Sequence, residues 1–557
     1  MKVNYIASNR HSGELKMSKQ SDLFKVQDVS RESLIPEVTD LMNSGARLMY
    51  ASGVDRGVFG FQLDYHFCFD DEAKSRYLLL RALVKRNEPT IPSLTPITTQ
   101  ADWAEREIIE FLGVKVEDHP DPRHLWLPLN WDDTHTRPDL EQNPESKRIN
   151  TDSPKKPPSD HIFTQPLSVV PYGPYHPALI ESNFLKMSVE DETVIDADLK
   201  LGFNHRSIIK LMERRDYYKD IYLSERICGF CNVHHTLTFV MAVENILGIE
   251  IPQKANYIRT LLGELERMKS HLLAIGLLGE LTGFKTMLMH SLRLREEILD
   301  SLEVISGQRI SHGAMTLGGV KIDITPVHAD FIRSRLKSLK SSVSEFFEQY
   351  LANDILIDRL KNVGHLSPAD ARTYGAVGPL ARGSGHPFDV RKQFPYAAYE
   401  DVSWEVITEN GADSLARLKV RMREFMVALD ICEQCCDILQ STPSSSPIVS
   451  TMSELPCGEG VAKTEPPRGE LLYHVASNGT NTPEFVRLRV PTFPNAPILL
   501  RLIKGGNIAD VPVVIGSIDP CFSCTDRATV VQADKEIIIQ KSSKTNENGE
   551  RFKRGGK

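Results

Sequence analysis

The 557-residue chain lacks any run of about 18 apolar residues, the length that a membrane-spanning helix requires. Its first residues also lack the apolar centre of a secretory signal. We therefore expect a cytoplasmic protein, in which any contact with a membrane would come through partner subunits. Positive charge is not in excess, because 74 Asp and Glu outnumber 66 Lys and Arg. We expect no nucleic-acid partner.

A dense cysteine framework of the kind that staples small secreted proteins is also missing, because nine cysteines are spread over a long chain. This spread favours reduced thiols that bind metals or pack in cores. Four of them form two Cys-x-x-Cys pairs, Cys228 with Cys231 and Cys521 with Cys524. Four thiolates suit a soft or borderline metal ion. The pairs lie 290 positions apart, which disfavours the compact loop of a structural zinc site, although a zinc scaffold stays an alternative.

A polar stretch with five prolines and no hydrophobic period predicts a linker over residues 131–162. Before it, residues 65–70 and 75–86 are typical of paired strands, and residues 101–113 indicate an amphipathic helix. Residues 1–130 are therefore predicted to form a small α+β domain.

After the linker, we expect one large domain over residues 163–527. Short strand-like pieces are followed by helical patterns over 258–272, 285–306, 328–352 and 414–440. The predicted fold class is α+β, with the small N-terminal domain followed by a mainly α-helical domain. Residues 528–557 are predicted to be a polar C-terminal extension.

The residues around the cysteines, R-I-C-G-F-C-x-x-x-H and D-P-C-x-x-C, resemble the two signature motifs of nickel-iron hydrogenase large subunits. The resemblance implies that four thiolates hold nickel, with Cys228 and Cys521 as terminal ligands. Cys231 and Cys524 would also bridge to an iron that carries cyanide and carbon monoxide.

Two further segments resemble the energy-converting branch of that family. G-P-Y-H-P-A-L-I-E, ending at Glu181, resembles a segment whose glutamate relays protons to and from a terminal nickel cysteine, allowing one extra residue before the acid. E-P-P-R-G, with Arg468, resembles the segment whose arginine faces the open metal position, and Asp519 is expected nearby. Taken alone, Glu181 would be an exposed loop acid and Arg468 a salt-bridging residue.

The glycine-rich stretch over residues 375–385, with Asp389, resembles the hydrogenase and complex I large-subunit family. It lacks the Lys-Ser/Thr of a phosphate loop, so we expect a tightly packed turn near the metal or the small subunit, with Arg382 as a minor site candidate. By contrast, Cys432, Cys435 and Cys436 share one face of a helical pattern and are expected to pack in the core, as is Cys68.

The N-terminal domain carries D-W-A-E-R-E, a glycine, and H-P-D-P-R at residues 119–123. These resemble the signature of the 30-kDa subunit of complex I, where the role is scaffolding. Its fusion to a hydrogenase-like, complex I 49-kDa-like large-subunit domain resembles the formate hydrogenlyase and hydrogenase-4 type. Together the resemblances cover roughly residues 40–527. Arg527, three positions after Cys524, matches that branch, in which a maturation endopeptidase removes the following extension once nickel is bound. A retained tail is the alternative.

The implied activity is reversible reduction of protons to H2, with H2 evolution as the physiological direction. The chain shows no convincing iron-sulfur motif of its own, so [4Fe-4S] clusters are expected in partners only. The resemblance implies an iron-sulfur small subunit, complex-I-like membrane subunits, and formate dehydrogenase or ferredoxin as electron donor. The main rival is a fused 30/49-kDa subunit of a complex-I-like NADH:quinone oxidoreductase, which shares His205 and Arg206 but lacks the cysteine pairs.

Overall fold

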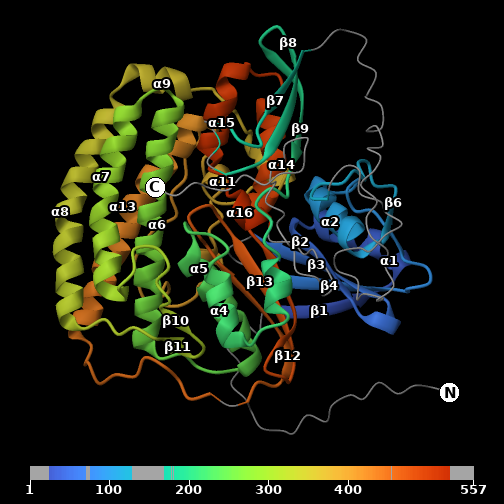
Figure 1. The fold of residues 1–557 in the computed structure, drawn as a ribbon, viewed down its shortest axis with the longest axis horizontal. Coiled ribbons are helices and arrows are strands. Elements are labelled where there is room, and N and C mark those ends of the chain that lie inside the picture. The colour runs from blue at the N-terminus through green and yellow to red at the C-terminus, as the bar shows by residue number, and fades with distance from the viewer. Residues whose placement is uncertain are drawn as a thin grey trace, which may run out of the picture.

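The computed structural model describes residues 24–70, 76–127, 168–176, 179, 181–452 and 454–526. The predicted linker and the C-terminal extension lie outside these ranges, so their boundaries stay predictions. Within the described ranges the chain combines long helices with several sheets (Figure 1). Among these helices, none has both the length and the apolar character needed to cross a bilayer.

The N-terminal part is a four-stranded sheet flanked by helices, drawn in blue in Figure 1. The strand order is β1-β4-β3-β2, with β1 parallel to β4 and the other neighbours antiparallel. The elements are β1 (Phe24–Val29), α1 (Arg31–Asn43), β2 (Ala46–Asp55), β3 (Phe61–Phe69), β4 (Arg76–Val84), β5 (Thr90–Pro92), α2 (Asp102–Leu112) and β6 (Lys115–Glu117). The strands predicted at 65–70 and 75–86 and the helix at 101–113 are confirmed.

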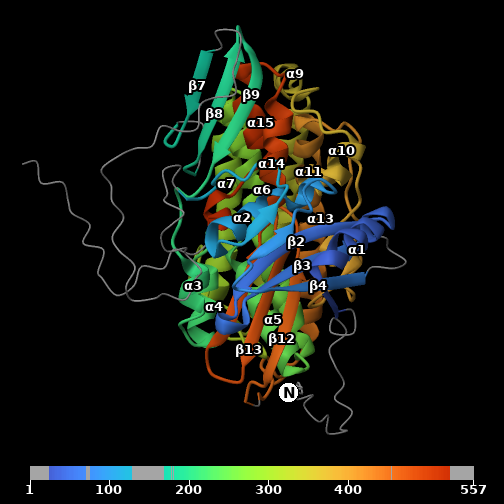
Figure 2. The ribbon, with the colours of Figure 1, turned by 90° about the vertical axis from the view of Figure 1, so that its right-hand side faces the viewer.

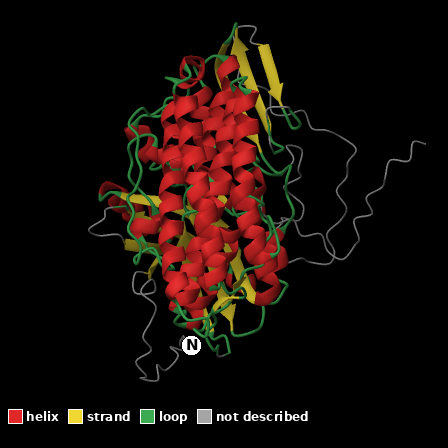
Figure 3. Cartoon of the chain, turned by 90° about the vertical axis from the view of Figure 1, so that its left-hand side faces the viewer, coloured by secondary structure: helices red, strands yellow, loops and turns green. Residues whose placement is uncertain are grey.

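Four long helices form the body of the second part, as Figure 3 shows from the helical side. They are α6 (Gln253–Leu281), α7 (Lys285–Ser306), α8 (Pro326–Leu351) and α13 (Ser414–Ser441). All four cover ranges where the apolar period predicted helices. The helix α6 packs against α7 and α13, and α8 completes the layer against the same two helices.

The helix α6 is buried on more sides than its apolar residues indicate. Those residues recur at 3 and 4 residue spacing over 258–272 and form one stripe, whereas the structure buries almost the whole circumference of the helix, including Glu264, Glu266, Arg267 and Lys269. The reason is that α7, α13, α15 (Val511–Ile518) and α5 (Asn232–Leu247) surround it. Its charged residues must therefore pair inside the protein.

Two three-stranded antiparallel sheets complete the fold. One contains β7 (Ser168–Tyr172), β8 (Phe184–Glu190) and β9 (Thr193–Lys200), where strand-like pieces were predicted. The other contains β12 (Cys457–Thr464), β13 (Leu471–Asn478) and β14 (Pro483–Arg489), three strands that were not predicted from the sequence.

The N-terminal sheet packs beside β12 and β13 (Figure 2). Buried charges fix this contact: Arg47 Nη1 lies 3.0 Å from Glu470 Oε2, and Arg489 Nε donates to the carbonyl of Met49 at 3.0 Å. Arg81 pairs with Glu459 at 2.6 Å. The two parts are therefore joined by specific ion pairs as well as by apolar packing.

Shorter elements connect these layers. They are β10 (Met315–Thr316), β11 (Gly319–Val320), α3 (Ile208–Met212), α4 (Tyr217–Glu225), α9 (Asp354–Leu360), α10 (Pro368–Thr373), α11 (Pro379–Arg382), α12 (Val390–Gln393), α14 (Thr492–Ile503) and α16 (Phe522–Thr525). The paired cysteines lie at two helix junctions, one between α4 and α5 and the other between α15 and α16.

Candidate metal centre

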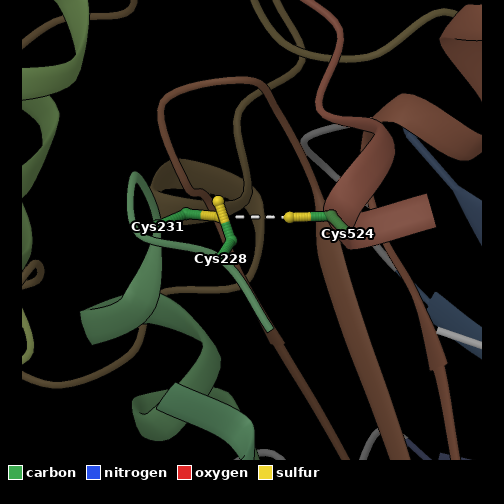
Figure 4. Close-up of side chains that lie close together, drawn as sticks. All are labelled: Cys228, Cys231 and Cys524. Carbon is green, nitrogen blue, oxygen red and sulfur yellow. Dashed lines mark hydrogen bonds between the residues drawn. The ribbon is translucent and has the colours of Figure 1, made fainter. Parts of the chain in front are cut away.

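The two Cys-x-x-Cys pairs lie at helix junctions that meet inside the second part of the chain. Cys228 and Cys231 follow α4, and Cys231 stands directly before the first residue of α5. Cys521 stands directly before α16, and Cys524 lies within it. Figure 4 shows Cys228 and Cys231 on one segment with their sulfurs turned toward Cys524 on the other.

The four sulfur atoms are close together and buried. Cys228 Sγ lies 3.4 Å from Cys521 Sγ, and Cys231 Sγ lies 3.5 Å from Cys524 Sγ. Cys521 Sγ and Cys524 Sγ are 3.1 Å apart. These distances exceed the roughly 2.05 Å of a disulfide bond, and all four cysteines are free thiols with exposed fractions of 4% or less. The chemistry of this set, four buried thiols that converge, fits a soft or borderline metal ion.

Local backbone contacts hold each pair in its turn. The N–H of Phe230 donates to Cys228 Sγ at 3.2 Å. The N–H of Cys521 donates to Thr492 Oγ1 at 2.9 Å. Asp519 ends α15 in the left-handed conformation, with φ of 59°, which Asp tolerates better than most residues. This turn redirects the chain so that Cys521 faces the first pair.

Arg206 joins the two cysteine segments to each other. Its guanidinium donates to the carbonyls of Arg226 and Ile227, both at 2.6 Å, and to the carbonyl of Ser523 at 3.0 Å. From the sequence, Arg206 was recognised only as a residue shared with the complex I family. Its role in joining the two segments could not be predicted from the spacing of residues in the sequence, because the three carbonyl groups that it contacts belong to segments far apart in the chain.

A buried carboxylate on α6 fixes the start of α5. Glu266 accepts from the N–H groups of Val233 at 2.8 Å and His234 at 3.1 Å, and from His234 Nδ1 at 2.6 Å. These are amides of the first helical turn, which have no partner inside the helix. On α5, His235 Nε2 lies 3.5 Å from Cys524 Sγ. The other ring nitrogen of His235, Nδ1, lies 2.8 Å from Tyr473 Oη.

Glu181 is placed beside the second pair. Its Oε1 lies 3.6 Å from Cys521 Sγ, and its Oε2 accepts from the N–H of Ser523 at 2.9 Å. Burial raises the pKa of Glu181, and the charge of Cys228 acts in the same direction. A small, mostly apolar pocket lined by Leu179 and Phe522, among others, adjoins this carboxyl group.

Arg468 and Asp519 form a buried ion pair next to the thiols. Arg468 Nη2 lies 2.8 Å from Asp519 Oδ1, and its Nε donates to the Asp519 carbonyl at 2.8 Å. Its Nη1 donates to Ser270 Oγ at 3.2 Å, and the guanidinium lies 5.4 Å from the ring centroid of Phe230. Burial raises the pKa of Asp519, while Arg468 and Arg421 oppose that rise. Arg468 is thus held in place by Asp519 and brings a fixed positive charge to the thiols.

The glycine-rich loop over 375–385 is a tightly packed turn, as predicted. Gly378 has φ of 67°, and a Cβ atom there would lie 2.3 Å from the carbonyl oxygen of Arg468. Only glycine permits this approach. The loop therefore supports the segment that carries Arg468, and Arg382 at its end is fully buried.

The cysteines that were expected to pack in the core do so. Cys432, Cys435 and Cys436 are buried in α13, and burial raises the pKa of each thiol. Cys68 is buried in β3. Among the described residues, one further group, Asp64, Glu459 and His474, has metal-like spacing. Arg81 already pairs with both of its carboxylates, at 2.7 and 2.6 Å, which makes it an ion-pair cluster between the two parts of the chain.

The N-terminal motif residues make internal structural contacts. Glu105 accepts from Ser93 Oγ at 2.6 Å and from the N–H of Leu94 at 2.6 Å. Arg106 donates to the carbonyl of Arg123 at 2.9 Å, and Arg123 pairs with Asp121 at 2.7 Å. These contacts tie loops to α2, as expected of a scaffold.

Three protein families match the chain. The respiratory-chain NADH dehydrogenase 30 Kd subunit matches residues 27–149, and the 49 Kd subunit of the same enzyme matches residues 282–527. The nickel-dependent hydrogenase family matches residues 206–278, which contain the first cysteine pair.

Curated proteins of several kinds are similar to the chain. The carbon monoxide-induced hydrogenase of Rhodospirillum rubrum is 38% identical over 64% of this chain and 99% of its own length. Formate hydrogenlyase subunit 5 of Escherichia coli is 33% identical over 90% of this chain and 89% of its own length. An NADH-quinone oxidoreductase subunit of Phocaeicola vulgatus is 30% identical over 86% of this chain and 94% of its own length.

A solved structure is also similar. A chain of the membrane-bound sulfane sulfur reductase, an archaeal respiratory membrane complex, matches with a TM-score of 0.62 and 30% identity. The match covers 65% of this chain and 98% of that chain.

Proposed function

The chain belongs to the family of energy-converting nickel-iron hydrogenase large subunits of the formate hydrogenlyase type, with a fused complex I 30-kDa-like domain, and from this we propose its function. It is the catalytic subunit of a membrane-bound hydrogenase that reduces protons to H2 reversibly. The observation that carries this proposal is the buried set of four converging thiols with a carboxyl group 3.6 Å from one of them.

Cys228, Cys231, Cys521 and Cys524 would hold the nickel-iron centre. When bound, that centre supplies a metal pair that accepts electrons and at which protons and H2 interconvert; its iron carries cyanide and carbon monoxide. The protein keeps the thiols buried and places a cation beside them. Arg468 brings the charge, and Asp519 holds Arg468 in place.

Proton movement falls to Glu181. Its Oε1 is close enough to Cys521 Sγ to exchange a proton with that thiolate, and the Ser523 amide fixes the orientation of the carboxyl group. A proton released from Glu181 to Cys521 Sγ would be delivered at the edge of the metal centre. The reverse transfer would carry a proton away during H2 oxidation.

Electrons come from a partner, because the other five cysteines do not form a cluster site: Cys432, Cys435, Cys436 and Cys68 pack in the core, and Cys457 is exposed alone. The partner is an iron-sulfur small subunit with [4Fe-4S] clusters, docked on complex-I-like membrane subunits at the inner face of the membrane. Formate dehydrogenase or ferredoxin supplies the electrons, and H2 evolution is the physiological direction. A maturation endopeptidase would cut after Arg527, which lies outside the described residues.

The second candidate function is that of a fused subunit in a complex-I-like NADH:quinone oxidoreductase. It is favoured by the 30% identity to the Phocaeicola vulgatus protein over most of the length of both proteins. The four buried thiols weigh against it, because that branch does not use them.

Metal content separates these functions. The protein is purified without oxygen together with its partners, nickel and iron are measured, and infrared spectra are recorded for cyanide and carbon monoxide. Nickel, iron and both ligands, with H2 evolution from a reduced dye, support the hydrogenase. Absence of nickel from the mature protein overturns it, and zinc without iron supports a scaffold. Cys436→Ser is the control, since it removes a buried thiol outside the set.

A further inference from the structure

Seven fully buried charged side chains meet in one cluster beside the candidate metal centre, between α6, α11, α12, α13 and the segment that carries Arg468. Each exposes 2% or less of its surface. The acids are Glu264, Asp389, Glu424 and Glu465, and the bases are Arg267, Arg382 and Arg391.

Arg382 is the centre of this cluster. Its Nε lies 2.6 Å from Glu424 Oε1, and its Nη1 lies 2.8 Å from Glu465 Oε1 and 3.3 Å from Asp389 Oδ2. The carboxyl groups of Glu465 and Asp389 therefore share one guanidinium nitrogen. The N–H of Val390 also donates to Glu465 Oε2 at 3.2 Å.

The other two arginines complete the cluster around Glu264. Arg391 lies 2.7 Å from Asp389 Oδ2 and 3.1 Å from Glu264 Oε1. Arg267 lies 3.0 Å from Glu264 Oε2. With all groups ionised, four negative charges face three positive charges.

The remaining polar neighbours do not supply the missing positive charge. His271 contacts Glu424 at 2.9 Å, but burial lowers the pKa of His271 to about 4, so it is neutral at physiological pH. Arg421 donates to the carbonyls of Ser517 and Ile518 and forms no ion pair with the cluster; its charge acts more strongly on Asp519 beside the thiols than on Glu424. The other neighbours are the hydroxyl groups of Tyr396 and Tyr399, and Tyr399 donates to Glu264.

We propose that this cluster holds one exchangeable proton on Glu465, next to Asp389, and that the protein takes up and releases this proton as the charge on the neighbouring thiol site changes. Two carboxylates that share a site cannot both ionise cheaply, because like charges in a dry interior repel. Uptake breaks one O–H bond of a hydronium ion from the solvent and forms one O–H bond on Glu465, which changes the charge of the cluster from −1 to 0. No electron moves within the cluster.

The electrostatics of the pair place the proton on Glu465. Burial raises the pKa of Glu465 to about 7, and the charge of Asp389 adds to that rise. Although burial also raises the pKa of Asp389, the charges of Arg391 and Arg382 outweigh it and hold that pKa low.

The link to the thiol site runs through the chain itself. Glu465 begins the Glu-Pro-Pro-Arg segment that ends at Arg468, and Arg468 pairs with Asp519 beside the thiols. Negative charge gained at the thiol site would therefore favour protonation of Glu465. This part of the inference rests on the proposed function, whereas the existence of the proton does not.

The test is infrared spectroscopy of the purified complex, following the carbonyl stretch of a protonated carboxyl group, which shifts in heavy water. We expect one such band to disappear between about pH 5.5 and about pH 8.5, with a midpoint near the raised pKa. Glu465→Gln should abolish this band. Glu470→Gln is the matched control, because Glu470 is an equally buried acid five positions later, and the bases around it lower its pKa.

A second variant tests the charge count without changing Glu465. Glu424→Gln leaves three acids for three arginines, so the midpoint should fall by about one unit or more. Three results would each overturn the proposal that Glu465 holds an exchangeable proton. They are an unchanged band in Glu465→Gln, an unchanged midpoint in Glu424→Gln, and the absence of a titrating band in the wild type.

Nickel separates this inference from the proposed function. The band should be present in protein with or without nickel, and in nickel-loaded protein near the midpoint it should grow when the site is reduced. No growth on reduction would overturn the coupling to the thiol site. A missing band in nickel-loaded, active protein defeats the inference alone, and a normal band in protein that never binds nickel defeats the proposed function alone.

Discussion

Replacement of Glu181 by glutamine tests the proposed route of protons most directly. Glutamine has the same shape and can still accept from the Ser523 amide, which now holds Glu181 Oε2 at 2.9 Å. It cannot take up and release a proton at the position 3.6 Å from Cys521 Sγ. We therefore expect a correctly assembled site that no longer exchanges protons.

A positioned acid or base contributes a factor of roughly 100 to 10,000, which corresponds to about 3 to 5 kcal/mol of activation free energy. H2 evolution by Glu181→Gln should fall by that factor, and exchange between H2 and heavy water should fall with it. Nickel content and the cyanide and carbon monoxide bands should stay as in the wild type. Glu181→Asp keeps the acid on a shorter side chain, so it should retain part of the activity.

Glu190→Gln is a suitable control, because Glu190 is an exposed acid at the end of β8, nine positions after Glu181. Its activity should match the wild type. If Glu181→Gln binds nickel fully and keeps more than about a tenth of the activity, which corresponds to a loss of only about 1.4 kcal/mol, then protons use another route.

Four further predictions concern the metal, its support and stability. Cys524→Ser should lose nickel and all H2 evolution, as measured by elemental analysis and gas chromatography. Arg468→Lys should keep nickel but evolve H2 more slowly, roughly 10- to 100-fold, because lysine lacks the planar fork that pairs in two directions. Glu470→Gln leaves buried cations unpaired, so it should lower the free energy of unfolding by about 3 to 5 kcal/mol, as measured by chemical denaturation. Lys340→Met is the control: it breaks an exposed ion pair and should lower the same free energy by less than about 1 kcal/mol. Because the pKa of Glu465 is raised in the folded state, the folded protein binds one more proton than the unfolded chain between about pH 4.5 and about pH 7. The free energy of unfolding should therefore fall by about 3 kcal/mol as the pH rises through that range. Glu465→Gln should remove this pH dependence in the same denaturation series.

The sequence determined the kinds of element and the candidate ligands. Helices α7 and α13 lie where a 3.6-residue apolar period runs over many turns, which is the strongest local signal that a sequence carries. The two cysteine pairs could be selected because a Cys-x-x-Cys turn is a local device and because its flanking residues resemble a known family. Their role as metal ligands stays a prediction, although the structure brings the four sulfurs together.

Only the tertiary structure decided which charges are buried and what they contact. The apolar residues of α6 form one stripe, yet four surrounding helices also bury its acids and bases, and no pattern within 29 residues could show this. Arg206 clamps both cysteine segments, and Glu465 shares Arg382 with Asp389, through residues that lie far apart in the chain. Such contacts depend on how distant segments meet, because a charge that packing removes from water is stable only when it is paired. The local sequence fixes the helix and the turn, and the packing of the whole chain decides the electrostatics of the site.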